Sequence, residues 1–335
     1  MNDKDLALVA KSLVSPGKGL LAADESTGTI KKRFEAVGLT SSPELNRKYR
    51  EMLLATPGIE EFISGVILFD ETTRQETGGM SFSKYLEGRG ITPGIKVDEG
   101  REPFNGEEVA KGLEGLDKRL PEYKEMGLSF TKWRAPIAIT EVYPSAEMLE
   151  ENARRMAEYA YISQENGFVP IVEPEVLITG NHTTARCEEV SVATLKALFS
   201  ALDKRGVILE KALLKTNMVL PGKDNGVKAS PLEVAEATLR ALKTIVPPTL
   251  PGIVFLSGGQ SPSEATANLD EINKRKEDAP WELSFSFARA LQEEALNIWK
   301  GEDANISKAQ AAFQKRARLV SLARKGEYSP SLENE

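Results

Sequence analysis

The chain has 335 residues, of which 41% are hydrophobic and 28% charged, so it is long enough for one large core or two ordinary domains. Its formal net charge of −7 argues against general nucleic-acid binding. Because the chain holds one histidine, His182, and one cysteine, Cys187, it cannot assemble the usual zinc site or an internal disulfide.

The sequence carries no sign of membrane insertion or export. No apolar run approaches the length of a transmembrane helix, and residues 1–5 lack the charged-then-apolar order of a signal peptide. We therefore expect a soluble, cytoplasmic protein. His182 lies in a polar loop sequence, where we expect its side chain to be solvated.

Strand-like and helix-like segments alternate along the chain, which predicts a parallel sheet with helical crossovers. The expected strands are Gly19–Asp24, Gly65–Asp70, Thr92–Asp98, Phe130–Ile137, Phe168–Val176, Ala212–Val219, Gly252–Gly258 and Leu283–Phe287. Eight strands separated by helices favour a closed (β/α)₈ TIM barrel, and a doubly wound open sheet is the alternative. We expect an α/β fold with one domain over residues 1–335, an N-terminal helical extension and further helices after Trp281.

The helices between these strands have clear start and stop signals. Segments 230–233 and 261–264 both read Ser-Pro-X-Glu, which is a capping box with proline at the first helical position. Another predicted helix follows Ser145 and ends at 166–167 (Asn-Gly), and the next one carries Cys187 on its apolar face. Cys187 is therefore expected to pack in the core rather than to react.

Polar side chains recur at the carboxyl ends of the predicted strands. Alternate residues of a strand share a face, and one face of a barrel points inward. The residues that share a face in this way are Asp24, Lys96 with Asp98, Lys132 with Arg134, Glu173 with Glu175, and Lys215 with Asn217. One such pair could be a solvated strand end, but five of the eight strands ending like this are typical of a (β/α)₈ active site.

Lys215 lies inside the apolar run 212–219, which otherwise reads as a buried strand. Taken alone, it is best interpreted as a strand-end lysine whose ammonium reaches water or an acidic partner. Within the constellation above, burial and a second ammonium would favour a neutral, nucleophilic amine that attacks carbonyl groups. The neighbouring carboxylates would then transfer protons.

The last two strands end in a sequence suited to phosphate. Ser257 and Gly258 open a glycine-rich turn whose backbone N–H groups can approach an anion closely. After the eighth strand, Ser286 and Arg289 add a hydroxyl and a guanidinium, and this fold often holds phosphate in the loops after strands seven and eight. Lys96 with Arg134 could hold a second phosphate on the opposite side.

Seven motifs spread over nearly the whole chain resemble those of class I fructose-bisphosphate aldolases. They are 21–27 (LAADEST), 65–69 (GVILF), 94–98 (GIKVD), 132–134 (KWR), 170–175 (PIVEPE), 214–219 (LKTNMV) and 255–261 (FLSGGQS). The resemblance implies a (β/α)₈ barrel that cleaves fructose 1,6-bisphosphate reversibly to dihydroxyacetone phosphate and glyceraldehyde 3-phosphate in glycolysis and gluconeogenesis. It implies no metal, no cofactor and no membrane partner, and a homotetramer.

The same resemblance assigns roles to individual residues. Lys215 would form the Schiff base and Glu173 would be the main general acid and base, with Glu175, Lys132 and Asp24 around it. Asp24 would also orient the substrate hydroxyl. The substrate-binding positions implied are Ser257, Gly258, Ser286, Ala288, Arg289 and Arg33 for the ketone-side phosphate, Ser26, Thr29 and Lys96 near the other phosphate, and Arg47 and Arg134 as further basic residues.

Two departures from the better-known animal members concern the site. Ala288 stands where those members have glycine, so phosphate binding by its N–H requires a backbone angle that suits a residue with a Cβ. The last residues, 331–335, lack the terminal tyrosine of animal members. The rival interpretations are another Schiff-base barrel, such as a transaldolase or keto-acid aldolase, and a binding or scaffold protein on an inherited barrel.

Overall fold

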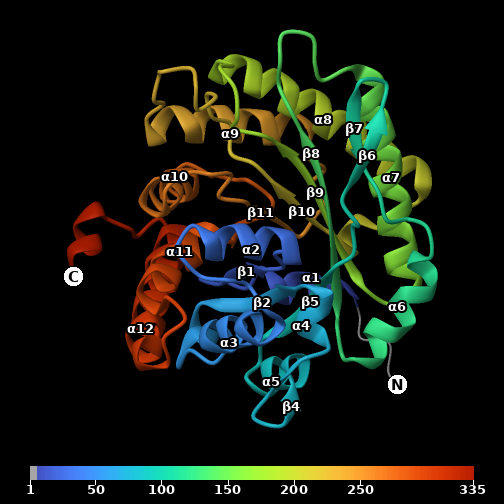
Figure 1. Cartoon of the computed structure of the whole chain (residues 1–335). Helices are drawn as coiled ribbons and strands as arrows, with labels where there is room; N and C mark the ends of the chain where they lie inside the picture. Colours follow the sequence, from blue (N-terminus) through green and yellow to red (C-terminus); the bar gives the residue numbers. More distant parts are fainter. Residues whose placement is uncertain (1–5) are drawn as a thin grey trace.

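Eight parallel strands form a closed barrel in the computed structural model, which describes residues 6–335 (Figure 1). The barrel strands are β1 (Gly19–Ala23), β2 (Ile63–Leu68), β5 (Thr92–Lys96), β8 (Phe130–Ile137), β9 (Val169–Val176), β10 (Leu213–Thr216), β11 (Gly252–Phe255) and β12 (Glu282–Phe287). Around the barrel they follow the order β1-β12-β11-β10-β9-β8-β5-β2. The predicted (β/α)₈ barrel is therefore confirmed, while residues 1–5, on which the signal-peptide argument rested, lie outside the described part.

Helices surround this barrel, and two short hairpins extend from it. The helices are α1 (Leu6–Leu13), α2 (Thr27–Glu35), α3 (Pro43–Leu54), α4 (Asp70–Thr73), α5 (Phe82–Gly88), α6 (Leu116–Glu125), α7 (Ala146–Glu165), α8 (Thr184–Arg205), α9 (Pro231–Ile245), α10 (Pro262–Lys274), α11 (Arg289–Trp299) and α12 (Ile306–Lys325). Short 3₁₀ helices occur at Ile59–Glu61, Leu209–Lys211, Asp303–Asn305 and Pro330–Asn334. The hairpins pair β3 (Glu76–Thr77) with β4 (Met80–Ser81) and β6 (Arg101–Phe104) with β7 (Glu107–Ala110). None of the helices described within residues 6–335 is both long and apolar enough to cross a lipid bilayer.

Strand alternation sorts the barrel interior into an apolar end and a charged end. The interior side chains nearest the strand starts are apolar, and they form one buried cluster: Leu20, Ala22, Ile67, Phe130, Val169, Ile171, Leu213 and Val254. Ala10 and Leu13 of α1, with Val14, join this cluster and close that end of the barrel. The N-terminal extension thus removes the starts of the strands from water and leaves the carboxyl ends open for a site.

The predicted capping signals are present in the structure. Ser230 and Ser261 each accept a hydrogen bond from the backbone N–H three residues on, and Glu233 and Glu264 return the second bond of the capping box. Cys187 is buried in α8, as expected, with its neighbours on the apolar face.

Several strands end earlier than the sequence indicates. β10 ends at Thr216 and β11 at Phe255, each three residues before the predicted end, and β2 and β5 end at Leu68 and Lys96, two residues before it. Asn217 does not share the interior face with Lys215: its Oδ1 accepts the backbone N–H of Val176 at 3.0 Å. The Asn217 amide thus takes the place of a β10 backbone oxygen beside β9 after β10 has ended. It pairs the buried N–H of Val176, which would otherwise have no partner.

Gly94 offers a test of packing in the barrel interior. A Cβ at this position would overlap the ring of Phe130, which is fully buried. Gly94→Ala should therefore lower the free energy of unfolding by about 1–3 kcal/mol, the usual cost of overpacking a core. Urea unfolding measures it, with Gly88→Ala as the control, because a Cβ on Gly88 in α5 meets no atom within 4 Å. Equal stabilities for the two variants would show that the Phe130 ring moves aside freely.

Candidate active site

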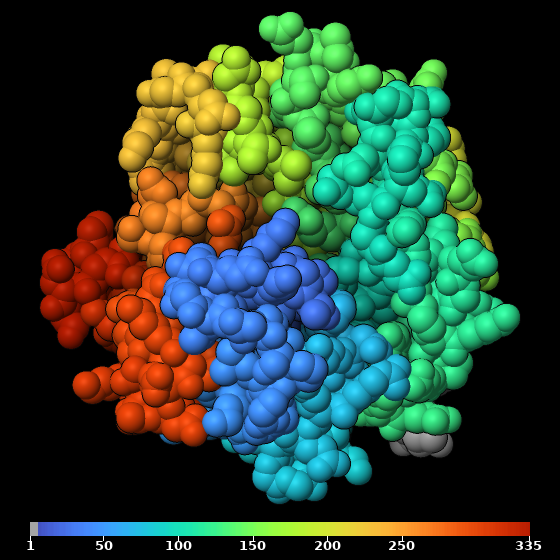
Figure 2. Space-filling model, in the orientation of Figure 1, coloured from blue at the N-terminus to red at the C-terminus, as the bar shows by residue number. Residues whose placement is uncertain are grey.

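A cavity of about 1170 Å³ lies at the carboxyl ends of the barrel strands. Figure 2 shows it as a hollow bordered by the blue segment around α2 and the teal β6–β7 hairpin. Every residue predicted for the site except Arg47 lines it. These residues are Asp24, Ser26, Thr29, Arg33, Lys96, Lys132, Arg134, Glu173, Glu175, Lys215, Ser257, Gly258, Ser286, Ala288 and Arg289.

Lys132 holds the centre of the cavity floor. Its Nζ lies 2.6 Å from Oδ2 of Asp24 and 3.1 Å from Oε2 of Glu173, and the side chain is only 3% exposed. Three elements meet there, since Asp24 follows β1, Lys132 lies on β8 and Glu173 on β9. A buried ammonium in this position needs both partners, because its desolvation costs several kcal/mol.

Lys215 lies beside this group with a single acidic partner. Its Nζ is 3.0 Å from Oε1 of Glu173, and its side chain is 4% exposed. Within residues 6–335, the two lysines therefore share the two oxygens of one carboxylate, and only Lys132 has a second carboxylate, that of Asp24. Lys215 is thus held by fewer opposite charges than Lys132.

The charges in this group shift one another's pKa values. Burial opposes ionisation of Asp24, but the ammonium groups of Lys132 and Lys215 outweigh it and lower the pKa of Asp24 far below its ordinary value. Glu173 behaves in the same way: burial acts against the same two lysines, and the pKa is lowered. For Lys132, burial is offset by Asp24 and Glu173, which raise its pKa. Both carboxylates are thus ionised and Lys132 stays cationic at neutral pH.

The loops after β11 and β12 form one corner of the cavity. Gly258 and Gly259 have φ values of +54° and +82°, which turn the backbone sharply after Ser257. Ser286 is 1% exposed, and its Oγ has no hydrogen-bond partner among the described residues although it lines the cavity. The guanidinium of Arg289, at the start of α11, forms no ion pair with any carboxylate of residues 6–335. Uncompensated positive charge and an unused buried donor are what a phosphate needs.

Ala288 occupies this corner without the backbone conflict that a Cβ could have caused. Its φ is −105° and its ψ is −89°, so it does not lie in the left-handed region that favours glycine. The departure from glycine at this position is therefore compatible with an N–H directed at an anion.

The cations on the opposite side of the cavity are already paired. Nζ of Lys96 is 2.7 Å from Oδ1 of Asp98, and Nε of Arg134 donates to Glu175. The pKa of Arg134 is raised, since the nearby Glu175 carboxylate outweighs the effect of burial. A phosphate on this side would have to share these cations with carboxylates that they already bind.

Arg33 is fixed by a buried network behind the cavity wall. Its Nη1 donates to Glu25 and, at 3.2 Å, to Oε1 of Gln292. Glu25 also binds Arg50, whose Nη2 lies 2.6 Å from Oε2 and whose side chain is 2% exposed. Glu25 was not identified from the sequence as a site residue, although it directly follows Asp24.

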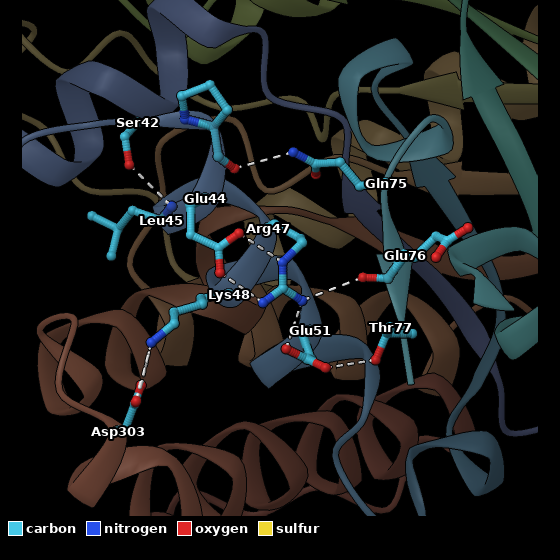
Figure 3. Close-up of polar contacts among 11 residues, drawn as sticks. Ser42, Glu44, Leu45, Arg47, Lys48, Glu51, Gln75, Glu76, Thr77 and Asp303 are labelled. Atoms are coloured by element: carbon cyan, nitrogen blue, oxygen red, sulfur yellow. Dashed lines mark hydrogen bonds and ion pairs between the residues drawn. The ribbon is translucent and has the colours of Figure 1, made fainter. Parts of the chain in front are cut away.

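Arg47 is the predicted site residue that the structure does not bring to the cavity. It lies on α3, where Nη2 and Nη1 are 2.8 Å and 2.9 Å from carboxylate oxygens of Glu44 and Glu51 (Figure 3). Nη1 also donates to the backbone oxygen of Glu76 at 3.3 Å. These contacts join α3 to the β3–β4 hairpin, and a role for Arg47 in substrate binding stays a prediction.

Several cavity residues were missed because they lie in loops or helices beyond the strand ends. Arg74, Arg101, Arg119 and Lys223 all line the cavity. His182, which was expected to be solvated, is 6% exposed, so that expectation is wrong. The loop after β10 covers it, and Gly222 N–H donates to its backbone oxygen at 2.8 Å. Within the described residues, no three His, Cys, Asp or Glu side chains are grouped so that they could hold a metal ion.

Comparisons with known proteins agree over the length of the chain. The family model described as fructose-bisphosphate aldolase class-I matches residues 5–335. A probable class 1 fructose-bisphosphate aldolase of Xanthomonas campestris pv. campestris is 49% identical over 333 residues, covering 98% of this chain and 99% of the relative. A cytosolic fructose-bisphosphate aldolase of Arabidopsis thaliana is 48% identical, covering 97% of this chain and 84% of the relative. The solved structure of a Plasmodium falciparum fructose-bisphosphate aldolase, in complex with TRAP and a small-molecule inhibitor, superposes on this chain with a TM-score of 0.95 and 44% sequence identity. The match covers 98% of this chain and 96% of that chain.

The central lysine can be tested through the pH dependence of stability. Lys132→Met leaves two buried carboxylates with one ammonium, which should cost about 3–5 kcal/mol of unfolding free energy at pH 7.5. One carboxyl group would then have a raised pKa in the folded state, so the variant should lose stability as the pH rises from 5 to 7.5. In the wild type, the pKa of Asp24 is lowered, so the stability that this group contributes is fully present above its ordinary pKa of 3.8 and is lost only as the pH falls below that value, outside the range from 5 to 7.5.

Urea midpoints at pH 5 and pH 7.5 provide the measurement. The double variant Lys132→Met/Asp24→Asn is the control, because it removes one carboxylate together with its partner and should recover most of the loss. If the single variant follows the wild-type pH profile in parallel, the three charges are not coupled as described.

Proposed function

The chain belongs to the class I fructose-bisphosphate aldolase family, and on this premise we propose that Lys215 is the amine that forms the Schiff base with the substrate ketone. The enzyme is a lyase that reversibly cleaves fructose 1,6-bisphosphate to dihydroxyacetone phosphate and glyceraldehyde 3-phosphate, a reaction of glycolysis and gluconeogenesis. One observation carries the assignment of the amine. Lys215 shares Glu173 with Lys132, but Lys132 is held by a second carboxylate and has a raised pKa.

Schiff-base formation needs a proton acceptor and then a proton donor, and we assign both roles to Glu173. Its carboxylate can take a proton from Lys215 Nζ at 3.0 Å, so that the free amine attacks C2 of the ketone. Glu173 then returns that proton to the hydroxyl of the carbinolamine, which leaves as water and yields the protonated imine. Lys132 keeps its charge throughout and stabilises the oxygen that develops negative charge.

The protonated imine promotes cleavage because it accepts the electron pair of the bond that breaks. A carboxylate removes the C4 hydroxyl proton, the C3–C4 bond breaks, and its electron pair moves into the iminium to form an enamine. Glu173 is the main base in this proposal; Asp24 orients the hydroxyl, and Glu175 borders the same wall of the cavity. Such a base typically contributes 10²–10⁴-fold in rate. Protonation of the enamine at C3 and hydrolysis of the imine then release dihydroxyacetone phosphate.

Two groups of residues would hold the phosphates. We assign the ketone-side phosphate to the corner of Ser257, Gly258, Ser286, Ala288 and Arg289, with Arg33 on the adjoining wall. The other phosphate is assigned to the side of the cavity that carries Ser26, Thr29, Lys96 and Arg134. The first assignment is supported by Arg289 and the Ser286 Oγ, since neither has a partner among residues 6–335. Anchoring both ends would fix the sugar in reacting geometry.

We also propose a homotetramer in the cytoplasm, with one domain over residues 1–335. The family resemblance supports the tetramer, and relatives described as cytosolic support the location. Light scattering coupled to size-exclusion chromatography tests the assembly.

Trapping the imine tests the assignment of Lys215. Borohydride reduces an imine to a secondary amine, so adding it with dihydroxyacetone phosphate should attach the substrate to Lys215. Lys132 and Lys96 should remain unlabelled, because each holds a carboxylate within 2.7 Å. Peptide mapping by mass spectrometry locates the adduct, and an adduct on either of the other lysines would refute the assignment.

Two substitutions extend this test. Lys215→Met should abolish both labelling and cleavage with little effect on folding, since methionine fills a similar volume without a charge to desolvate. Lys215→Arg should also be inactive, because the guanidinium stays protonated and cannot form the imine. Circular dichroism and urea midpoints show whether the fold is retained in each.

Arg289 tests the ketone-side phosphate corner. Arg289→Ala should raise the KM for fructose 1,6-bisphosphate. The expected loss of binding free energy is roughly 1.5–3 kcal/mol, the range for hydrogen bonds to charged groups. Arg240→Ala, which removes an exposed arginine paired with Glu188 away from the cavity, is the control. Steady-state cleavage kinetics decide the matter; identical KM and kcat/KM in the two variants would place the phosphate elsewhere.

A further inference from the structure

A lysine that the sequence did not single out lies beside Arg289. Lys223 follows β10 in the loop that leads to α9, and it lines the cavity. Its Nζ and Nη2 of Arg289 lie 3.4 Å and 3.2 Å from the position that a Cβ on Gly259 would occupy. Two cationic groups thus flank the same point of the glycine turn, close enough for one phosphate to contact both.

The loop fixes the position of Lys223 through its backbone. Lys223 N–H donates to the oxygen of Ile178 at 2.8 Å, and Asp224 N–H donates to the oxygen of Gly180 at 2.9 Å. In return, Gly180 N–H donates to Oδ2 of Asp224 at 3.3 Å. Gly222 permits this contact, because a Cβ there would overlap the backbone oxygen of Gly180. The loop is therefore docked on the loop after β9, and the Lys223 backbone does not depend on a ligand for its place.

No carboxylate compensates this pair of cations. Neither Lys223 nor Arg289 forms an ion pair with an acidic residue among those that the structure describes. Glu264 has a pKa below its ordinary value, but the main cause is its hydrogen bonds to Ser261, with Lys228 and Lys223 contributing less. The buried Oγ of Ser286 adds a donor without a partner to the same corner. Two unpaired cations beside an unused buried donor form a built site for a doubly charged phosphate monoester.

We propose that Lys223 is a second cationic ligand of the ketone-side phosphate, reaching it across Gly259 from Arg289. The inference rests on the proposed function for the identity of the phosphate, which is that of dihydroxyacetone phosphate or of C1 in the bisphosphate. Lys223 contacts the substrate away from the reacting bond, so it contributes to binding rather than to the chemical step.

Two measurements separate this role from a structural one. In the condensation direction, Lys223→Gln should raise KM for dihydroxyacetone phosphate about fivefold, a modest effect because the lysine is partly in water. KM for glyceraldehyde 3-phosphate, whose phosphate lies on the other side, and kcat should stay unchanged. Lys223→Arg should keep most of the affinity. The matched control is Lys228→Gln, which removes the same charge from the same loop at a side chain that is 92% exposed and lies outside the cavity lining.

Calorimetric titration of dihydroxyacetone phosphate measures the same contact without chemistry. In a Lys215→Met background, Lys223→Gln should weaken the Kd by the same factor, whether or not the wild-type enzyme cleaves the bisphosphate. Suppose that the wild type cleaves the bisphosphate normally but Lys223→Gln leaves Kd and KM unchanged. That result would overturn the inference about Lys223 and leave the proposed function intact. An effect on glyceraldehyde 3-phosphate equal to that on dihydroxyacetone phosphate would overturn it too. Weakened binding in an enzyme that never forms the imine would instead support the phosphate contact and refute the proposed chemistry.

Discussion

The chemistry of the site depends on a shortage of carboxylates around two buried lysines. Asp24 and Glu173 provide charge for Lys132 and Lys215, but Asp24 forms its ion pair with Lys132. Lys132 is therefore locked as an ammonium, while Lys215 depends on an oxygen of Glu173 that can also accept its proton. Glu173 thus contacts both lysines, while Asp24 distinguishes Lys132 from Lys215, although the two residues are of the same type. The barrel interior keeps water away from these side chains, which strengthens the electrostatic effect of this difference.

The fold produces this arrangement by separating apolar and charged layers along each strand. Val169 and Ile171 point inward before Glu173 on β9, and Phe130 points inward before Lys132 on β8. The apolar layer is closed by α1, so water reaches the charged layer only from the open end. Because the apolar cluster and α1 occupy the amino ends of the strands, the carboxyl ends are where charged side chains of different strands meet around an open cavity.

The sequence was most informative about which face of a strand a side chain lies on, because that depends on a period of two residues. Alternation placed Lys132, Glu173 and Lys215 on the interior face, because a strand residue changes face at every step regardless of how the sheet closes. It could not show which lysine receives the second carboxylate, since that depends on how Asp24, at the end of β1, is placed across the barrel relative to β8 and β10. It failed for Asn217, because β10 ends at Thr216 and the Asn217 side chain bonds to the backbone of β9. Alternation has no bearing on Arg47, which the family resemblance implied and which lies on α3, or on Lys223, whose loop conformation follows from the close contact of Gly222 with another loop. Neither position leaves a periodic signal.

The two ends of the cavity differ in how their cations are neutralised, and this difference implies an order of binding. In the described part of the chain, Arg289 has no carboxylate partner, whereas Lys96 and Arg134 are bound to Asp98 and Glu175. A phosphate gains more where it meets uncompensated charge than where it must displace an existing partner. We therefore expect the ketone-side phosphate to bind first and to bring C2 to Lys215 before the other half of the substrate is ordered. In the condensation direction this order is required, because the enamine must exist before the aldehyde can add to it.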